Sequence, residues 1–462
     1  MPMARVNRLV TLEQALASTG SDVKEWFAAY INPELASLLT LVGADRRYVA
    51  ACGMTVADAD GREYLDFLGG YGSLNLGHNH PELLAALASV SELPNILQAS
   101  MNPVASALAA SLAHISPGAL QKNFLCNSGA EAVEAALKLA RAATGREGLL
   151  SCEQSFHGKT FGALSVTGRT HYRAPFQPLV PGCDYVPFGD FRPLQDRLRT
   201  GRYAAFIVEP VQGEGGIIVP PAGYLWEAQQ LCRDTGTLFV LDEVQTGLGR
   251  TGYLFAAEHD QLEPDVMALA KSLGGGLVPV GACLSTDDVW RKAYGRRDRS
   301  LLHTSTFGGN TRASAVALKT LEILLRDDLP AKAQRKGALF LQRLQGMAER
   351  LPLIKEVRGR GLMIGVEFHS PQAGPEWVRG YLGAAVCGLL LEEYQIISAF
   401  TFNNPNTIRF EPPLTVSDEQ LQRAADALED ICASHRDFRG TATHLVRTLL
   451  RRKLHRTFRK SV

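Results

Sequence analysis

Residues 238–252 read LFVLDEVQTGLGRTG, and this stretch decides the fold assignment. Its first four residues are apolar and run directly into two carboxylates, Asp242 and Glu243, and then into a loop rich in glycine. A continuous apolar run is typical of a strand that is covered on both faces in a mainly parallel sheet. Ligands of such sheets bind beyond the carboxyl ends of the strands. The two acids therefore predict a polar site at the tip of this strand.

Similar apolar runs follow one another from about residue 120 onward. They are FLC (124–126), GLLSC (148–152), YAAFIVEP (203–210), TLFVLDEV (237–244), VMALA (266–270) and VGACLS (280–285). Two periodic segments between them stop at a glycine, EAVEAALKLARAATG (131–145) and GYLWEAQQLCRDTG (223–236), and indicate crossover helices. This alternation predicts an α/β fold with a mainly parallel central sheet in a large domain.

The pattern changes beyond about residue 335, where a long polar helix precedes two β-like runs, VRGRGLMIGVEF and TIRFEPPL. These elements favour a smaller α+β domain. Near the N-terminus, TVADADGREYLDFLGG resembles a hairpin and an edge strand, so we expect both chain ends to build the smaller domain. The predicted parts are 1–75 (N-terminal segment of the small domain), 76–335 (large domain), 336–440 (C-terminal part of the small domain) and 441–462 (a basic tail).

Composition excludes several classes of function. The 462 residues contain 48 lysines and arginines against 47 acids, so net charge gives no reason to expect nucleic acid or an acidic partner. The eight cysteines form no C-x-x-C pair or cluster with histidine, which disfavours a disulfide framework and a zinc site. The N-terminus has no apolar core of signal-peptide length, and no segment reaches the roughly 18 apolar residues of a membrane span. We therefore expect a soluble, cytoplasmic protein without a metal.

Polar groups follow five of the predicted strands, at the ends where parallel strands meet. These groups are Asn127-Ser128-Gly129-Ala130, Phe156-His157-Gly158-Lys159, Glu209, Asp242 and Lys271. Each alone has an ordinary explanation as a helix cap, a strand cap or a solvated lysine. Five of them at one edge of one sheet favour a common ligand.

Pyridoxal phosphate is the ligand whose chemistry these groups suit. The helix that opens at Ser128-Gly129-Ala130 offers N–H groups and a positive dipole end to a phosphate. Lys271 lies between small apolar residues and a glycine turn, so its amine is suited to form a Schiff base with the cofactor aldehyde. A carboxylate such as Asp242 would hold the pyridine nitrogen protonated, and the protonated ring is an electron sink.

Seven motifs in order carry a resemblance to a known family. They are CNSGAEAVEAALKLAR, SFHGKTFGALSVTG, VEPVQGEGG, LDEVQTGLGRTG, ALAKSLGGGLVPVGA, STFGGN and IRFEPPL. Through them the chain from about Val56 to about Leu414 resembles the class III, fold type I, pyridoxal-phosphate-dependent aminotransferases. The resemblance implies an enzyme with a large cofactor-binding domain and a smaller domain made from both chain ends.

The resemblance also implies roles for particular residues. Lys271 would be the Schiff-base lysine, Asp242 the catalytic partner of the pyridine nitrogen, and Gln245 the partner of the ring hydroxyl. Glu209 and Arg409 would form the pair that sorts substrates. The remaining cofactor contacts would come from Ser128, Gly129 and Ala130 at the phosphate, from Phe156 and Val244 on the two ring faces, from His157, and from Thr306 of a neighbouring subunit in a homodimer with shared sites.

Within the family, FNNPNTIRFEPPLTV and LGGYGSLNLGHNHP are most similar to the putrescine branch. The leading hypothesis is an ω-aminotransferase that moves an amino group from a diamine or terminal amine to 2-oxoglutarate or another keto acid. Ornithine-, acetylornithine- and 4-aminobutyrate-type enzymes share the core motifs, as do natural-product transaminases that act on aldehydes or ketones. An aminomutase or epimerase, and a catalytically silent binding protein, are further alternatives; the silent protein is disfavoured because Lys271 and Asp242 are both present.

The segment HLVRTLLRRKLHRTFRK (444–460) extends beyond the usual final helix of that family. It has seven lysines and arginines, no acid, and apolar residues at roughly helical spacing. This pattern predicts an amphipathic basic helix, which either packs on its own protein or makes a weak membrane or protein contact.

Overall fold

The computed structural model describes residues 9–41, 43–97, 100–369, 382–435 and 440–448. Its largest element is a seven-stranded sheet in the order β4-β10-β9-β8-β7-β5-β6. The strands are β4 (Leu120–Cys126), β10 (Gly281–Thr286), β9 (Val266–Leu269), β8 (Leu238–Asp242), β7 (Tyr203–Val208), β5 (Gly148–Cys152) and β6 (Cys183–Val186). Neighbours are parallel except at β10, which is antiparallel to both β4 and β9. The mainly parallel α/β sheet is thus confirmed.

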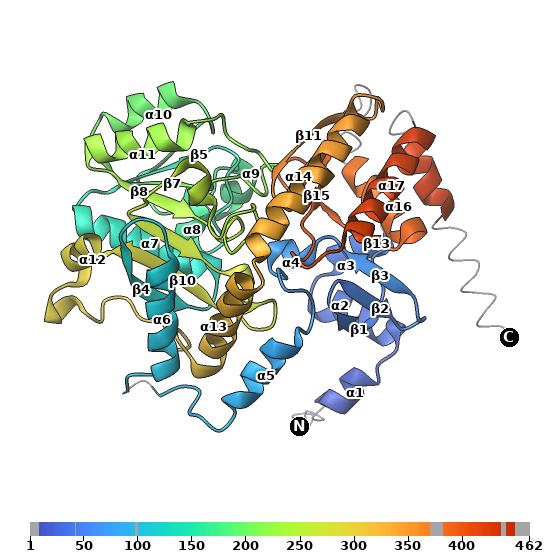
Figure 1. The fold of residues 1–462 in the computed structure, drawn as a ribbon, viewed down its shortest axis with the longest axis horizontal. Helices are drawn as coiled ribbons and strands as arrows, with labels where there is room; N and C mark the ends of the chain where they lie inside the picture. Colours follow the sequence, from blue (N-terminus) through green and yellow to red (C-terminus); the bar gives the residue numbers. More distant parts are fainter. Residues whose placement is uncertain (1–8, 42, 98–99, 370–381, 436–439, 449–462) are drawn as a thin grey trace, which may run out of the picture.

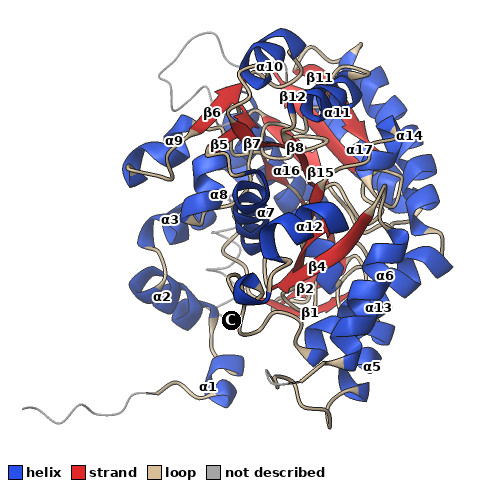
Figure 2. Ribbon diagram, turned by 90° about the vertical axis from the view of Figure 1, so that its left-hand side faces the viewer, coloured by secondary structure: helices blue, strands red, loops and turns tan. Residues whose placement is uncertain are grey.

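Helices cover both faces of this sheet (Figure 2). Side chains alternate along each strand, so in β8 Val240 packs on one face while Phe239 and Leu241 pack on the other. The helices on the Val240 face are α7 (Gly129–Thr144), α8 (Phe161–Val166) and α12 (Asp287–Tyr294); those on the opposite face include α6 (Pro103–Ile115), α10 (Phe191–Leu198), α11 (Tyr224–Thr235) and α13 (Thr311–Arg326). This two-sided burial explains why the strands read as continuous apolar runs.

The predicted crossover helices α7 and α11 both end immediately before the glycine that was expected to stop them. Gly145 and Gly236 follow them with φ of 68° and 64°, the left-handed conformation that glycine adopts without a Cβ clash. Strand β6 was not predicted, because its sequence CDYV is half polar and only its last residue is fully buried.

Two four-stranded sheets make up the rest of the β structure of the described residues, and they bring the two ends of the chain together (Figure 1). The first has the order β1-β2-β3-β13, from β1 (Tyr48–Cys52), β2 (Thr55–Asp58), β3 (Glu63–Asp66) and β13 (Ile396–Ile397). The second has the order β11-β12-β15-β14, from β11 (Ile354–Arg360), β12 (Met363–Phe368), β15 (Thr407–Phe410) and β14 (Ala399–Phe400). Because β3 pairs with β13, the smaller domain is built from both ends of the chain, and β3 is not the edge strand that we expected.

Further helices complete the fold. They are α1 (Leu12–Leu16), α2 (Gly20–Tyr30), α3 (Pro33–Leu41), α4 (Gly69–Gly72), α5 (Pro81–Ser89), α9 (Thr170–Arg173), α14 (Leu329–Ala348), α16 (Leu382–Tyr394) and α17 (Asp418–Ser434). The domain boundary predicted after residue 335 falls inside α14. No helix in the described ranges is long and apolar enough to cross a bilayer.

The C-terminal segment is helical over residues 440–448. Leu445 is 8% exposed and packs against Gly388 of α16, while His444 lies 2.8 Å from the Glu393 carboxylate. This part of the predicted tail helix packs on its own protein. The rest of that prediction, residues 449–460, lies outside the described residues.

Candidate active site

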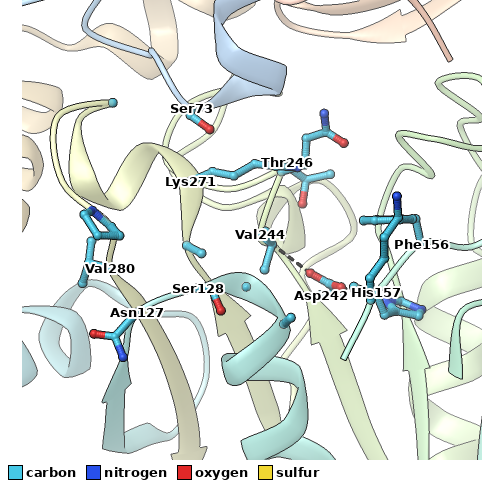
Figure 3. Close-up of a pocket in the computed structure, with 18 of the residues that line it drawn as sticks. Ser73, Asn127, Ser128, Phe156, His157, Asp242, Val244, Thr246, Lys271 and Val280 are labelled. Carbon is cyan, nitrogen blue, oxygen red and sulfur yellow. Dashed lines mark hydrogen bonds and ion pairs between the residues drawn. The ribbon is translucent and has the colours of Figure 1, made fainter. Parts of the chain in front are cut away.

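A pocket of about 670 Å³ lies at the carboxyl ends of the parallel strands, where the sequence predicts a site (Figure 3). The residues after β4, β5, β7, β8 and β9 all contribute to its wall, together with the residues that lead into the reversed strand β10. Of the sequence-predicted site residues, the pocket wall contains Ser128, Gly129, Ala130, Phe156, His157, Glu209, Asp242, Val244, Gln245 and Lys271.

The N-terminus of α7 forms one side of the pocket. Ser128 is its N-cap, and the Ser128 hydroxyl accepts a hydrogen bond from the Glu131 N–H. The first N–H groups of a helix have no intrahelical acceptor, so those of Gly129 and Ala130 remain for a ligand. A Cβ on Gly129 would lie 2.8 Å from Val244 Cγ1, and glycine therefore lets the helix end approach the tip of β8.

The carboxylate of Asp242 ends β8 and is held from two directions. Its Oδ1 accepts a hydrogen bond from the Val244 N–H at 3.1 Å, and its Oδ2 lies 2.7 Å from His157 Nδ1. His157 is buried, and its Nε2 has no hydrogen-bond partner among the described residues. The imidazole therefore helps to fix the orientation of the Asp242 carboxylate.

Lys271 follows β9 and opens a short 3-10 helix, with φ of 46°. A non-glycine residue rarely adopts a positive φ, and such residues concentrate at functional sites. Burial lowers the pKa of Lys271, although the carboxylates of Glu411, Glu214 and Asp242 oppose this change. A lowered pKa increases the fraction of the neutral, nucleophilic amine.

Glu209 directly follows β7 and is buried beside Asp242. Its two oxygens accept hydrogen bonds from the N–H groups of Phe156, at 2.9 Å, and Gly213, at 3.1 Å. Burial raises the pKa of Glu209 to about 7; His157 opposes the rise and Asp242 adds to it. Glu209 therefore connects the loops that follow β5 and β7.

The predicted ion pair between Glu209 and Arg409 is wrong. Arg409, on β15, instead lies 2.7 Å from Glu214 Oε2, and its other guanidinium nitrogen lies 3.6 Å from Glu411. The loop after β7 turns back through the bridge between Gln212 and Ile218, and this turn brings the second glutamate of VEPVQGEGG to the arginine. The first glutamate, Glu209, lies at the end of β7, where its carboxylate oxygens accept hydrogen bonds from backbone N–H groups.

Both carboxylates act on the charge of Arg409. Burial lowers the pKa of the guanidinium, but Glu214 and Glu411 more than offset this effect and raise it. Burial similarly raises the pKa of Glu214, and Arg409 more than offsets the effect so that the pKa lies below its usual range. Each residue of the pair therefore favours the charged form of the other, although both are buried.

Glu411 was missed by the sequence analysis, and the signal for it was an acid between buried residues in IRFEPPL. It is fully buried, and its Oε1 accepts a hydrogen bond from Gln245 Nε2 at 2.8 Å. Gln245 also donates to the Tyr71 carbonyl at 3.2 Å. Glu411 thus contacts both Gln245, which is predicted to contact the cofactor ring, and Arg409, which is predicted to contact the substrate.

Arg409 and Thr306 lie outside the pocket wall formed by the described residues. Arg409 stands behind it, with its guanidinium 5.3 Å from the centre of the Tyr71 ring. Thr306 is exposed in the loop before α13. Its contact with a neighbouring subunit stays a prediction.

The residues present fit pyridoxal phosphate. A helix N-terminus for the phosphate, a carboxylate fixed by a histidine, a partly buried lysine and the apolar side chains of Phe156 and Val244 all face one cavity (Figure 3). The separate roles of these residues toward the cofactor stay predictions.

The protein-family model described as "Aminotransferase class-III" matches residues 43–432. Aminotransferase PigE of Serratia sp. (strain ATCC 39006) is 40% identical over 453 residues, which cover 89% of this chain and 53% of that protein, so the chain spans about half the length of this curated relative.

Two solved structures are similar over almost their whole length. Ornithine aminotransferase from Toxoplasma gondii ME49 is 34% identical with a TM-score of 0.81, and the match covers 91% of this chain and 97% of that one. The (S)-enantioselective omega-transaminase from Thermomicrobium roseum is 32% identical with a TM-score of 0.81, and the match covers 89% and 98%.

Proposed function

The chain belongs to the class III aminotransferase family, whose cofactor is pyridoxal phosphate, and from this premise we propose an ω-aminotransferase activity. The donor is a diamine or another terminal amine of putrescine-like length, and the acceptor is 2-oxoglutarate or another keto acid. The observation that carries this proposal is the buried pair between Arg409 and Glu214.

That pair addresses the difficulty of binding two unlike substrates in one site. A terminal amine has no carboxylate next to its reacting carbon, and an unpaired buried guanidinium would be costly while such a donor is bound. Glu214 supplies the missing charge in the donor half-reaction. When the keto acid arrives, its carboxylate replaces Glu214 and makes a bidentate contact with the guanidinium.

Pyridoxal phosphate supplies an electron sink that stabilises the charge left on the substrate carbon after a proton is removed. The protein residues do the rest. The α7 N-terminus would bind the phosphate, and Asp242, oriented by His157, would keep a proton on the pyridine nitrogen. The Lys271 amine, whose pKa is lowered by burial, takes up the substrate proton and returns it.

A second candidate donor is ornithine, because the aminotransferase from Toxoplasma gondii is named for it and matches nearly the whole chain. Ornithine carries a carboxylate at its distal end as well as a second ammonium. Acetylornithine and 4-aminobutyrate also carry a distal carboxylate, whereas the only distal charge of a diamine is its second ammonium group.

A donor panel tests the proposal. The holoenzyme is mixed with 1,4-diaminobutane, ornithine, acetylornithine or 4-aminobutyrate plus 2-oxoglutarate, and the glutamate formed is measured. We expect the highest kcat/KM with the diamine. A higher value for any carboxylate-bearing donor would replace the diamine proposal, and the absence of glutamate with every donor would contradict an ω-aminotransferase that uses this acceptor.

A further inference from the structure

The turn of residues 401–407 lies between β14 and β15, immediately before the strand that carries Arg409. Two hydrogen bonds of 2.8 Å close it. One joins the Thr401 hydroxyl to the Asn404 carbonyl, and the other joins the Thr401 N–H to the Thr407 carbonyl. The turn is therefore compact, and its position is tied to that of the Arg409 guanidinium.

Side chains from the segment after β5 hold this turn from outside. Arg169, the N-cap residue of α9, donates through Nη1 to the Phe402 carbonyl and, at 3.1 Å, to Asn403 Oδ1. Asn403 Nδ2 donates in turn to the carbonyl of Gln154, two residues after β5, at 2.6 Å. Arg169 and Asn403 thus form a clasp between the turn and the segment that follows β5.

The clasped turn directs one backbone donor at the closest partner of Arg409. The Phe402 N–H donates to Glu214 Oε2 at 3.0 Å, and Arg409 Nη2 lies 2.7 Å from the same oxygen. The Asn403 N–H also donates to the Glu214 backbone carbonyl, at 3.1 Å. A backbone N–H and a guanidinium therefore converge on one point, and a carboxylate oxygen occupies that point.

This point lies beside the wall of the pocket. Glu214 directly follows Gly213, where a Cβ would lie 1.8 Å from Oε1 of Gln245, a residue of the pocket wall. Glu214 and Arg409 also both act on the pKa of Lys271, in opposite directions, and such charge effects weaken with distance. The two donors are therefore near the amine that the proposed function places at the reacting carbon.

A carboxylate that replaces Glu214 would meet both donors already in place. A buried N–H that loses its acceptor is costly, and so is a buried guanidinium that loses its closest partner. A ligand carboxylate with one oxygen at the position of Glu214 Oε2 satisfies both groups with charge-assisted hydrogen bonds.

We propose that the Phe402 N–H is a second donor to the substrate carboxylate, beside Arg409, and that Arg169 and Asn403 are the positioning residues that hold it there. This inference rests on the proposed function and deepens it, because it adds a recognition element for the keto acid. A terminal amine without a carboxylate leaves Glu214 on both donors.

Loss of the clasp has an effect that depends on Glu214. In the wild type, a displaced Phe402 N–H is lost both to Glu214 and to the carboxylate that replaces it, so the two losses largely cancel in the measured affinity. In Glu214→Ala no internal carboxylate competes, and the whole loss falls on the ligand. Comparing the two backgrounds therefore isolates the contribution of the Phe402 N–H.

The test measures the keto-acid half-reaction of the enzyme loaded with pyridoxamine phosphate. Stopped-flow measurement gives the 2-oxoglutarate concentration at half of the maximal rate for Arg169→Met in the wild-type and Glu214→Ala backgrounds. Methionine removes the donors of Arg169 and keeps a long side chain. Arg173→Met is the matched control, because Arg173 lies at the other end of α9 and its guanidinium is 3.9 Å from the centre of the Tyr185 ring.

In Glu214→Ala we expect Arg169→Met to raise the half-saturating concentration by about ten-fold, as the loss of one charge-assisted hydrogen bond does. In the wild-type background the rise should be about three-fold or less, because the two losses cancel. Asn403→Ala should act in the same way, Arg169→Lys should restore most of the affinity, and Arg173→Met should have no effect in either background. Calorimetric binding of glutarate, which has no reactive carbonyl, should follow the same pattern without turnover.

The same factor in both backgrounds, including no change in either, would overturn the inference, since general damage to the structure does not depend on Glu214. Glu214→Ala alone reports on the proposed function, because removal of the competing carboxylate should lower the half-saturating concentration of 2-oxoglutarate. An unchanged or higher value would contradict the replacement of Glu214 by the keto acid, and the inference with it. A donor panel that disfavours the diamine leaves this test intact, since no amine donor takes part.

Discussion

Glu209 and Glu214 lie in one loop, yet they have different partners. Backbone N–H groups hold Glu209, and the guanidinium of Arg409 holds Glu214. The family resemblance implies Glu209 as the partner of Arg409, and Glu209 also closes a strand at the edge where ligands bind. The path of the loop and the contact with the Phe402 N–H, which donates to Glu214 at 3.0 Å, decide the partner of Arg409, and both depend on long-range packing.

The proposed replacement of Glu214 by the keto-acid carboxylate at Arg409 predicts that two variants affect different half-reactions. Arg409→Lys should weaken the reaction with 2-oxoglutarate by about ten-fold or more relative to the reaction with the amine, since lysine cannot form a planar, bidentate contact. Glu214→Gln should impair mainly the amine half-reaction, because it leaves the guanidinium charge unmatched by its closest partner. Stopped-flow measurement of each half-reaction separates these effects. Equal losses in both halves for Arg409→Lys would contradict the exchange.

Lys271 provides a direct prediction about the covalent attachment of the cofactor. Lys271→Ala should fold and bind pyridoxal phosphate through the α7 N-terminus, but it should lose steady turnover. Borohydride reduction of the wild type followed by peptide mapping should find the pyridoxyl label on Lys271. A label on Lys159, the other lysine of the pocket wall in the described structure, would show that the assignment is wrong.

The buried carboxyl of Glu209 predicts a pH effect on the stability of the cofactor-free protein. Its pKa rises from 4.5 to about 7 on folding, so between these values the folded state holds a proton that the unfolded state has lost. The free energy of unfolding therefore decreases as pH rises through this window. Glu209→Gln lacks this proton, so its stability relative to the wild type should increase across the same window.

The increase is on the order of 3 kcal/mol, since one pKa unit corresponds to about 1.4 kcal/mol. Urea unfolding of both proteins at several pH values measures it. Comparing the pH dependence, instead of the stability at one pH, removes the constant cost of placing a glutamine amide next to two N–H groups. Parallel curves for the two proteins would contradict the raised pKa.

At the level of elements, the central sheet could be predicted well because its signals are local. The apolar strands of the large domain and the glycine stops of α7 and α11 are visible in short windows of sequence. What could not be predicted depends on contacts distant in sequence: the half-polar strand β6, the pairing of β3 with β13, and the burial of Glu411 against Gln245. The residues at the strand ends and Arg409 could be predicted, whereas the partners of Arg409, Glu214 and Glu411, could not.

Helix α14 offers a matched test of packing in one element. A Cβ on Gly337 would lie 2.0 Å from the Gly361 carbonyl oxygen, in the turn between β11 and β12, whereas a Cβ on Gly346 would have no atom within 4 Å. Gly337→Ala should destabilise the protein by ~1–3 kcal/mol through overpacking. Gly346→Ala should stabilise it by ~0.5–1 kcal/mol through helix propensity. Urea unfolding measures both, and shifts of the same sign would contradict this packing.

For the whole molecule, the arrangement of the chain ends matters most for the site. The cofactor residues all come from the large domain, whereas Arg409 and Glu411 come from β15 and its end in the smaller domain. Gln245 connects the two parts, since its amide donates to Glu411 and to the carbonyl of Tyr71. Movement of one domain against the other would therefore change the position of Arg409, the arginine proposed to sort substrates, relative to the cofactor residues.

Thr306 leads to a prediction about assembly. The loop that carries it is held on its own chain by the Asn127 amide, which donates to Ser305 Oγ at 3.0 Å, yet Thr306 itself is exposed and absent from the pocket wall of that chain. We predict that its hydroxyl reaches the phosphate site of a second copy in a homodimer with two-fold symmetry. Each site would then combine Lys271 of one subunit with Thr306 of the other.

This arrangement predicts complementation between two defective subunits. A heterodimer of Lys271→Ala and Thr306→Ala contains one site that lacks both groups and one site that lacks neither, because the intact lysine and the intact threonine meet at the same site. The heterodimer, isolated with two different affinity tags, should therefore recover about half of the wild-type activity and bind pyridoxal phosphate at one site with wild-type affinity. If Thr306 instead served its own chain, each site would lack one group, and the heterodimer would show no site of wild-type affinity.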